Sequence, residues 1–175
     1  MNSLVFMGVA GCGKSSVAQS VAAALGWAMV EGDSFHPPAN SAKMRAGIAL
    51  SDEDRAGWLD ALGAQLASYR LADRPVALTC SSLKRSYREQ LRAQSPGLRF
   101  VFLDIDRATS LARVQSRAGV HLFPASLVDS QFSALESPVG EPGVLRVDAT
   151  AALGDVTVQV VAWVSGNAVV AEVTA

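Results

Sequence analysis

The sequence predicts an α/β fold, a five-stranded parallel sheet with helices on both faces, in a single domain over residues 1–164. Two observations predict it. Short apolar runs of strand type alternate with longer helical patterns, which is typical of parallel strands joined by crossover helices. At the start of the chain, an apolar strand leads through a glycine-rich turn into an alanine-rich helix, the setting of a phosphate-binding loop.

The elements follow one another in regular order along the chain. Apolar, β-rich runs predict strands at residues 3–7, 27–31, 75–80, 98–105 and 144–147. Helical patterns occupy residues 14–25, 51–71, 84–94, 108–117, 125–135 and 153–164. Ser51 starts the second of these helices as the N-cap of a capping box, with the acid of Asp54 three residues later. Residues 165–175 follow as a C-terminal extension without a readable role.

Two segments, residues 32–50 and 117–125, interrupt the alternation of strands and helices. Active sites of open α/β sheets lie at the carboxyl ends of the strands, so both segments should border the bound ligand. Loops that close over phosphates exclude water, which competes with the acceptor for the transferred group. We therefore expect a substrate-binding insertion over about residues 32–58 and a mobile lid over about residues 113–125.

Composition excludes several classes of protein. Half of the 175 residues are apolar and 18% are charged, which argues against a disordered chain. The net charge of −1 gives no basis for general binding to nucleic acid. No apolar run reaches about 18 residues, so no membrane span is expected. The two cysteines, Cys12 and Cys80, do not form a disulfide framework, so we expect reduced thiols and a cytoplasmic chain. The first predicted strand begins at residue 3, so we expect no signal peptide.

The segment from Gly8 to Ser15 fits G-x-x-x-x-G-K-[ST], the phosphate-binding loop of mononucleotide kinases and NTPases. Backbone N–H groups of such a loop point inward, and the N-terminus of the following helix adds partial positive charge. Lys14 is expected to reach the β- and γ-phosphates of a nucleoside triphosphate, and the Ser15 hydroxyl to bind Mg²⁺. The predicted nucleotide-binding residues of the loop are Gly8, Gly11, Cys12, Gly13, Lys14, Ser15 and Ser16.

Two candidate residues follow the second predicted strand. The carboxylate of Asp33 could accept the proton of an acceptor hydroxyl, orient that hydroxyl, or hold Mg²⁺ through water. His36 stands before Pro37 and Pro38, which stiffen its loop, and it could bind a polyol or a carboxylate. The alternatives are a solvated turn for Asp33 and a structural histidine that holds its own loop for His36.

Further along, cationic side chains follow the third predicted strand and end a later helix. Lys84 and Arg88 suit an anionic substrate or phosphate, although solvation of a helix face is the alternative. Arg113 and Arg117 are four residues apart, so both guanidinium groups can approach one ligand from the same helix face. We predict that they serve the lid, where they would stack on adenine or neutralise phosphate charge. The helix macrodipole alone also favours arginines at this position.

A second basic group follows the paired prolines. Lys43 and Arg45 are expected to lie on a solvated helix face, and Arg55 completes the group without a definite role. Trp58 follows one turn after Arg55. It is expected to pack in the core or against its loop, and not to serve as a stacking platform for a ligand.

Several motifs together resemble the gluconate kinases, a family of small P-loop kinases that act on a sugar acid. The phosphate loop is shared by many kinases. The elements Gly-Asp-x-x-His-Pro, Asp-Glu-Asp-Arg-x-x-Trp-Leu and Cys-Ser-x-Leu-Lys are far more specific in combination. The likeness extends from residue 5 to about residue 164. Matching segments are residues 7–15, 31–37, 43–44 with Gly47, 50–55, 58–59, 80–84, 87–88, 130–132 and 135–136.

This resemblance implies a P-loop kinase fold and ATP-dependent phosphorylation of D-gluconate at its terminal hydroxyl, which gives 6-phosphogluconate. It implies that Asp33 orients or deprotonates the acceptor hydroxyl. His36, Arg88, Lys84 and Gln131 are then the residues that hold the sugar acid.

The resemblance also assigns the nucleotide side of the site and an assembly. Arg113 and Arg117 belong to the lid, where Arg117 joins Lys14 in neutralising the transferred group, and Asp148 precedes a loop near adenine. The expected Mg²⁺ ligands, Ser15 and Asp33, come from the residues themselves: Ser15 from the loop motif, and Asp33 through water. The family forms homodimers, so a homodimer is expected.

One departure from the family pattern concerns the lid. The family pattern is Arg-x-Gly-His-Phe, whereas this chain has an apparently longer segment from Arg117 to Pro124 that places His121 one residue later. We expect the longer segment to alter the closure of the lid or the rate of the reaction, and not to abolish function.

Other classes of protein remain open. Shikimate kinases are similar in size but carry a Gly-Gly-Gly-type turn where this chain has residues 80–84, and nucleoside kinases are a further rival. From a different class, a nucleotide-binding regulator without turnover would also retain the fold. A GTPase is disfavoured because the sequence contains no Asn-Lys-x-Asp signature.

Overall fold

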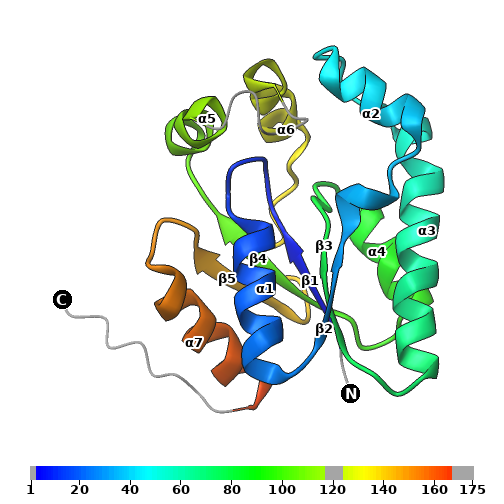
Figure 1. The fold of residues 1–175 in the computed structure, drawn as a ribbon, viewed down its shortest axis with the longest axis vertical. Helices are drawn as coiled ribbons and strands as arrows, with labels where there is room; N and C mark the ends of the chain where they lie inside the picture. Colours follow the sequence, from blue (N-terminus) through cyan, green and yellow to red (C-terminus); the bar gives the residue numbers. More distant parts are fainter. Residues whose placement is uncertain (1–2, 117–123, 167–175) are drawn as a thin grey trace.

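The computed structural model describes residues 3–116 and 124–166, which form a five-stranded parallel sheet with helices around it (Figure 1). The strand order is β2-β3-β1-β4-β5, and all four pairings are parallel. This confirms the predicted sheet. The strands are β1 Leu4–Met7, β2 Ala28–Glu31, β3 Val76–Thr79, β4 Arg99–Asp104 and β5 Val144–Asp148.

Seven α-helices and two short 3₁₀-helices lie within the described ranges. The α-helices are α1 Lys14–Leu25, α2 Pro38–Arg45, α3 Asp52–Leu71, α4 Arg85–Gln94, α5 Arg107–Ser116, α6 Val128–Ala134 and α7 Leu153–Val164. The 3₁₀-helices are η1 Gly32–Phe35 and η2 Ala125–Leu127. The helices α2, α5 and α6 lie beyond the carboxyl ends of the strands (Figure 1).

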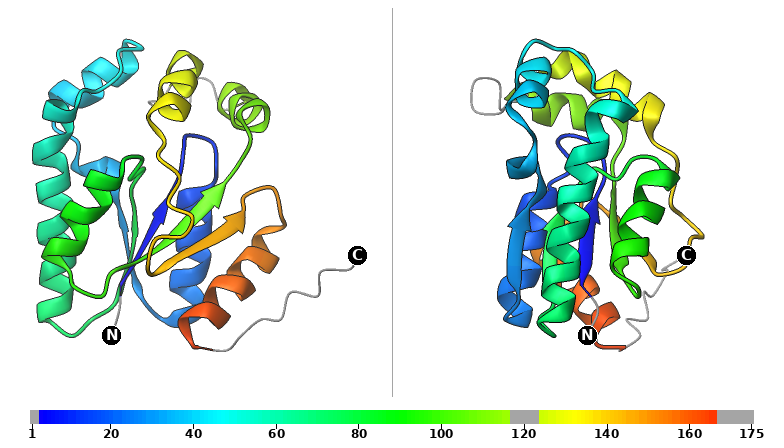
Figure 2. Two further views of the ribbon diagram at one scale, coloured as in Figure 1. Left: turned by 180° about the vertical axis from the view of Figure 1, so that it is seen from behind. Right: turned by 90° about the vertical axis from the view of Figure 1, so that its right-hand side faces the viewer.

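Two apolar cores cover the two faces of the sheet (Figure 2). Alternate residues of β1 point to opposite faces, so Leu4 and Phe6 pack with α1 and α7, whereas Val5 and Met7 pack with α3 and α4. Because both faces are covered, the whole of β1 is apolar and buried, which is why it reads as a continuous apolar run.

The capping box predicted for the helix after residue 50 is confirmed. The Ser51 hydroxyl accepts from the Asp54 backbone N–H at 3.2 Å, and the Asp54 carboxylate accepts from the Ser51 N–H at 2.9 Å. The two contacts satisfy donors that a helix N-terminus otherwise leaves without partners. They fix the point at which α3 turns away from the carboxyl edge of the sheet.

The structure differs from the sequence prediction at two helices. Residues 32–50 were expected to break the helical pattern, but they contain η1 and the eight-residue helix α2. Pro38 occupies the first turn of α2, where a proline lacks no needed hydrogen bond, so the paired prolines start a helix here. The helix predicted at residues 125–135 is divided into η2 and α6.

Some predictions fall outside the described ranges or have no independent check. Residues 117–123 of the predicted lid and residues 167–175 of the extension lie outside the described residues. The division into one domain with an insertion, a lid and an extension stays a prediction. Among the helices that the structure describes, none is long and apolar enough to cross a membrane.

Candidate active site

The phosphate loop joins the central strand β1 to α1. Gly8 and Gly13 have φ values of 139° and 93°, which residues other than glycine rarely adopt. Gly13 is the N-cap of α1, and no side chain caps this helix terminus, so its first N–H groups face the loop and suit an anion. Ser15 is exposed in the first turn, as is Ser16 beside it. These features fit a phosphate group.

Lys14 lies inside the same loop. Its Nζ donates hydrogen bonds to the carbonyl oxygens of Gly8 and Val9, at 3.1 and 3.0 Å. The ammonium group therefore lies over the loop into which a phosphate would bind. Cys12 is buried under the loop, with its Sγ 3.9 Å from Lys14 Nζ.

Side chains from α5 and α6 hold the middle of the phosphate loop. The Ala10 N–H donates to Gln131 Oε1 at 2.6 Å, and the Ser110 hydroxyl donates to the Ala10 carbonyl at 2.8 Å. Arg113 donates to the carbonyls of Gly11, at 3.4 Å, and Ala149, at 3.0 Å. Arg113 thus lies beside the phosphate loop, and its predicted contact with the nucleotide stays a prediction. Gln131, predicted to hold the sugar acid, contacts the loop instead.

Gly32 anchors the turn that carries Asp33 to the neighbouring strand. Its N–H donates to the Thr79 hydroxyl at 3.0 Å, and its carbonyl accepts from the buried Trp58 indole at 2.8 Å. A Cβ on Gly32 would lie 2.0 Å from the Thr79 carbonyl oxygen, so a side chain cannot fit here. Asp33 follows with an exposed carboxylate at the carboxyl end of β2. The backbone N–H of Gly8 donates to Ser81 O just after β3, at 3.3 Å, so this edge of the sheet is continuous from the Asp33 turn to the phosphate loop.

His36 is half-buried and stacks on Trp58, with ring centroids 4.1 Å apart and an angle of 16° between the planes. Burial lowers the pKa of His36 below its usual value; the Asp33 carboxylate opposes this shift and the Arg55 guanidinium adds to it. A neutral imidazole can both donate and accept a hydrogen bond, which suits contact with a hydroxyl group. Trp58 packs in the core, as predicted.

A cavity of about 370 Å³ lies where the first turns of α3 and α4 face α6. Two cations line it, Arg55 and Lys84. Lys84 Nζ contacts both carboxylate oxygens of Asp52, at 2.7 and 2.8 Å, and the Tyr87 hydroxyl donates a hydrogen bond to Asp52. The hydrogen bonds from Lys84 and Tyr87 hold the pKa of Asp52 below its usual value. The lining residues are Leu50, Ser51, Asp52, Glu53, Arg55, Leu83, Lys84, Tyr87, Ser130 and Ala134.

Lys84 therefore lies at a cavity, as expected of a substrate ligand, and Arg55 is a candidate that the sequence left without a role. The guanidinium of Arg55 lies 6.0 Å from the centre of the Tyr87 ring. The sequence feature that could have indicated Arg55 was its place in the first turn of a predicted helix, just after the capping box. The sequence does not show that this turn lies close to Lys84, because that proximity depends on the fold.

The structure corrects the role predicted for Arg88. Its guanidinium is fully buried and pairs with the Glu141 carboxylate, which also binds Arg92. Arg88 further donates to the carbonyls of Ser82, at 2.8 Å, and Leu83, at 3.1 Å. Its donors are thus used within the protein, and no exposed atom remains for a sugar acid. Arg88 fixes the turn before Lys84.

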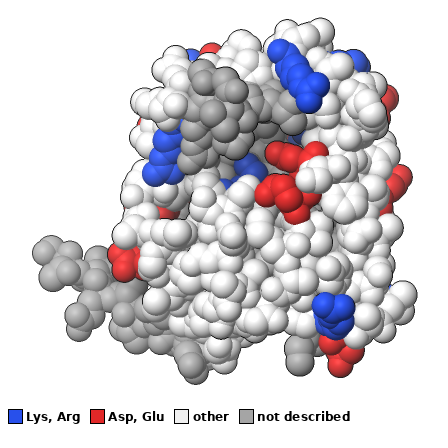
Figure 3. Space-filling model, in the orientation of Figure 1, with Lys and Arg blue, Asp and Glu red and all other residues white. Residues whose placement is uncertain are grey.

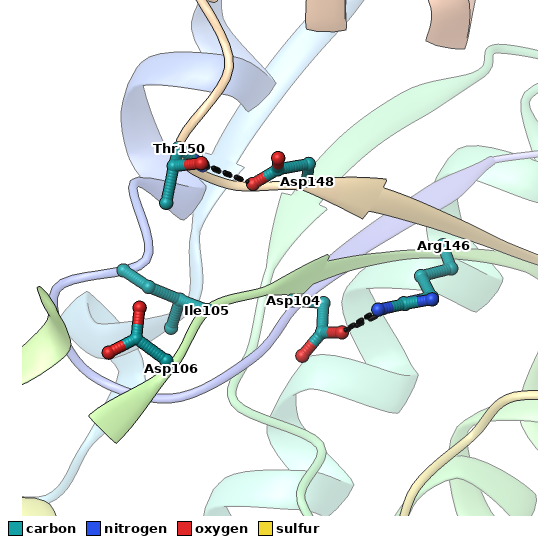
Figure 4. A pocket seen from close by; sticks show the side chains of 6 residues that line it. All are labelled: Asp104, Ile105, Asp106, Arg146, Asp148 and Thr150. Atoms are coloured by element: carbon teal, nitrogen blue, oxygen red, sulfur yellow. Dashed lines mark hydrogen bonds and ion pairs between the residues drawn. The ribbon is translucent and has the colours of Figure 1, made fainter. Parts of the chain in front are cut away.

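A second cavity, of about 530 Å³, lies at the carboxyl ends of β4 and β5 (Figure 4). Asp148 accepts hydrogen bonds from the Thr150 N–H and hydroxyl, at 2.8 and 2.6 Å, and these contacts lower its pKa. Arg146 donates to Asp104 at 2.8 Å. Arg113 contacts both the Ala149 carbonyl and the Gly11 carbonyl, which connects the segment after Asp148 to the phosphate loop; that this segment lies near adenine stays a prediction.

Acidic and basic side chains gather around a hollow above the carboxyl ends of the strands (Figure 3). In the part of the chain that the structure describes, no three acidic, histidine or cysteine side chains form a metal-binding group. Ser15 and Asp33, the residues predicted to bind Mg²⁺, are both exposed, and their binding of the ion stays a prediction. Arg117, predicted to be catalytic, lies outside the described residues.

A glycine-rich loop follows the central strand of this parallel sheet and leads into the uncapped N-terminus of α1, and this arrangement defines the P-loop kinase fold. A family model described as an AAA domain matches residues 4–139. Gluconokinase from Gluconobacter oxydans is 47% identical over 144 residues, covering 82% of this chain and 80% of that protein. Thermosensitive gluconokinase from Escherichia coli is 44% identical, with coverage of 90% and 84%. The crystal structure of a gluconokinase from Sinorhizobium meliloti 1021 is 43% identical with a TM-score of 0.85, covering 94% of this chain and 92% of that one.

The chain belongs to the gluconokinase family. The family predicted from the combined motifs is therefore confirmed.

Proposed function

We propose that this chain transfers the γ-phosphoryl group of ATP to the terminal hydroxyl of D-gluconate, giving 6-phospho-D-gluconate and ADP. One observation supports the proposal above others: the anchored turn at Gly32 holds Asp33 at the same edge of the sheet as an uncapped phosphate loop. Phosphoryl transfer needs charge neutralisation, in-line positioning and a dry acceptor. This edge offers groups for each of these needs.

On the nucleotide side, backbone N–H groups at the start of α1 bind the phosphates, and Lys14 neutralises charge on the β- and γ-phosphates. Arg113 borders the adenine from α5. Mg²⁺ supplies further neutralisation between the phosphates when bound, and Ser15 with Asp33 are the residues that would hold it. In the lid, the positive charge of Arg117 helps to neutralise the negative charge of the transferred group.

On the acceptor side, the hydroxyl oxygen of gluconate forms the new bond to the γ-phosphorus while the bond to the ADP oxygen breaks. Asp33 orients this hydroxyl and accepts its proton. Neutral His36 binds a hydroxyl of the polyol, and Lys84 and Arg55 attract the carboxylate. A cavity of about 370 Å³ is large enough for a six-carbon acid.

An assay of ADP release tests the proposal, with Mg-ATP and gluconate, shikimate, glycerate or a panel of nucleosides as acceptors. We expect turnover with gluconate. Asp33→Asn should lower kcat by about 10²–10⁴-fold, the usual contribution of a positioned general base. Asp60→Asn, at an exposed carboxylate on α3 that binds Gln90, is the matched control and should leave kcat unchanged.

Each other outcome contradicts a defined part of the proposal. Turnover with shikimate, glycerate or a nucleoside instead of gluconate would refute the acceptor. ATP binding without turnover on any acceptor would favour a regulator. An unchanged kcat in Asp33→Asn would remove the proton-accepting role of Asp33.

We also propose that the chain is a homodimer in the cytoplasm. The described cysteines support a reducing compartment, because Cys12 and Cys80 are both free and buried. Burial raises the pKa of Cys80 to about 11, so its thiol stays protonated and unreactive. Light scattering after size exclusion should give twice the 18.3 kDa mass of the chain; a monomer mass would refute the dimer.

A further inference from the structure

The backbone of Ala10 in the phosphate loop is held on both sides, through the two peptide groups that flank this residue, by side chains from distant helices. Its N–H donates to Gln131 on α6, at 2.6 Å, and its carbonyl accepts from Ser110 on α5, at 2.8 Å. The two partners lie 121 and 100 residues away along the chain. Neither contact belongs to the G-x-x-x-x-G-K-[ST] pattern.

The surroundings of the Ala10 backbone make these two hydrogen bonds costly to lose. Ser110 is fully buried, so its hydroxyl has little access to water as an alternative partner. A Cβ on Gly11 would lie 2.8 Å from the Ser110 carbonyl oxygen, so α5 approaches the loop backbone closely. Loss of either side-chain partner would leave a peptide N–H or C=O without its bond in a poorly solvated place.

The loop also needs an external support. Gly8, Gly11 and Gly13 all have positive φ values, and glycine loses the most conformational freedom when such a loop is fixed. The peptide between Ala10 and Gly11 can therefore rotate unless something holds it. Rotation would redirect neighbouring N–H groups, and small errors in the position of such groups are costly for binding and catalysis.

We propose that Ser110 and Gln131 are positioning residues, which hold the two peptide groups that flank Ala10 in the orientation that binds the triphosphate and do not bind the acceptor. The assignment rests on the nucleotide half of the proposed function and is independent of which acceptor is used. It replaces the sugar-acid role that the sequence suggested for Gln131.

The test uses Ser110→Ala and Gln131→Met, each of which removes one hydrogen-bonding group and nearly keeps the shape. The Kd of Mg-ATP is measured by calorimetry without acceptor, and KM values for ATP and gluconate by steady-state kinetics. Each variant should raise the Kd and KM of ATP by about tenfold, the effect of one lost buried hydrogen bond. The gluconate KM should stay within about twofold of the unmodified chain.

Matched controls separate positioning from general damage. Ser116→Ala removes a serine on α5 that contacts only the Arg113 carbonyl, and it should leave the Kd of ATP unchanged. Ser110→Thr keeps the hydroxyl and should restore most of the affinity lost in Ser110→Ala. Because the two single variants release adjacent peptide groups that share the Cα of Ala10, their effects in the double variant should be less than additive.

Three results would overturn the inference. A raised gluconate KM with an unchanged Kd of ATP in Gln131→Met would make Gln131 an acceptor ligand. A lower Tm with an unchanged Kd of ATP would make the contacts merely structural. Additive effects would mean that the two side chains act separately. If gluconate is not phosphorylated at all but the Kd of ATP rises as expected, the inference stands and the proposed acceptor fails.

Discussion

At the scale of single residues, Gly32 shows how one missing side chain positions the carboxylate that we propose to be catalytic. Its backbone is wedged against β3, where a Cβ would lie 2.0 Å from the Thr79 carbonyl oxygen. Any larger residue would push the turn, and Asp33 with it, away from the sheet. The anchor also joins Trp58, whose indole donates to the Gly32 carbonyl.

Gly32→Ala should therefore destabilise the protein and lower kcat. Overpacking of this kind costs about 1–3 kcal/mol, which corresponds to a loss in Tm of several degrees for a chain of this size. Gly57→Ala is the control, because a Cβ there meets no atom within 4 Å and alanine favours the helix α3. Thermal unfolding of both variants checks the prediction. Equal Tm values for the two would contradict it.

His36 gives the stability of the protein a dependence on pH. Its pKa is lowered from 6.5 by burial in the folded chain, so the unfolded chain binds a proton more readily. The contribution of His36 is complete above about pH 6.5, and the free energy of unfolding falls as the pH decreases below this value. Urea unfolding at about pH 7.5 and pH 5.5, without nucleotide or Mg²⁺, measures the loss. In His36→Gln this loss should be smaller; an equal loss would exclude His36 as its source.

Sequence motifs located Asp33, Lys14 and Ser15 because these residues lie within a few positions of a glycine-rich turn or a strand end. Arg88 was misjudged for a physical reason. Its charge is satisfied by Glu141, which lies 53 residues further along the chain, and a local pattern of cations carries no information on that partner. The roles of Gln131 and Ser110 were hidden in the same way.

At the scale of elements, the N-terminus of α3 depends on one serine hydroxyl. Ser51→Ala should cost about 1 kcal/mol, as usual for loss of an N-cap. Ser68→Ala, at an exposed position within α3, should not destabilise the protein. Urea unfolding compares them. Arg55 and Asp52 lie in the capped turn and line the cavity, so the KM for gluconate should also rise in Ser51→Ala. An unchanged KM would show that the cap does not affect substrate binding at the cavity.

The segment between α6 and β5 is tied to α4 by the Glu141 ion pairs. Burial raises the pKa of Glu141, but hydrogen bonds from Arg88 and Arg92 outweigh this effect and hold the pKa below its usual value. Glu141→Gln leaves the buried Arg88 without a counter-charge, which should cost about 3 kcal/mol in urea unfolding. Glu89→Gln breaks an exposed pair with Arg85 and should change little. Similar losses in the two variants would contradict the special role of burial.

At the scale of the whole molecule, nucleotide binding should stabilise the fold. Mg-ATP at 100 times its Kd adds about 2.7 kcal/mol to the free energy of unfolding, or a rise of about 5–10 °C in Tm. Lys14→Ala should lose most of this rise, whereas Lys43→Ala, which loses only a contact with Asp54, should keep it. A thermal shift assay measures both. An equal rise in the two variants would remove Lys14 from the nucleotide site.

The architecture was predictable because alternating strand and helix patterns, with one phosphate loop, allow few arrangements of a parallel sheet. The residue range of α2 and the division of the helix predicted at residues 125–135 into η2 and α6 were not. Short helices draw their stability from packing and caps more than from their own sequence, so their patterns are weak. Contacts between helices over the carboxyl edge likewise depend on the finished fold.

The central place of β1 also has a consequence for how the chain is made. Residues 4–7 leave the ribosome before either neighbour of this strand, because one neighbour begins at residue 76 and the other at residue 99. Until residue 104 has emerged, a fully apolar strand has an unpaired edge, which is the condition for aggregation and for recognition by chaperones. The phosphate motif is synthesised before Ser110 and Gln131, the residues that contact its backbone. Nascent chains should gain affinity for nucleotide only after residue 131 has emerged.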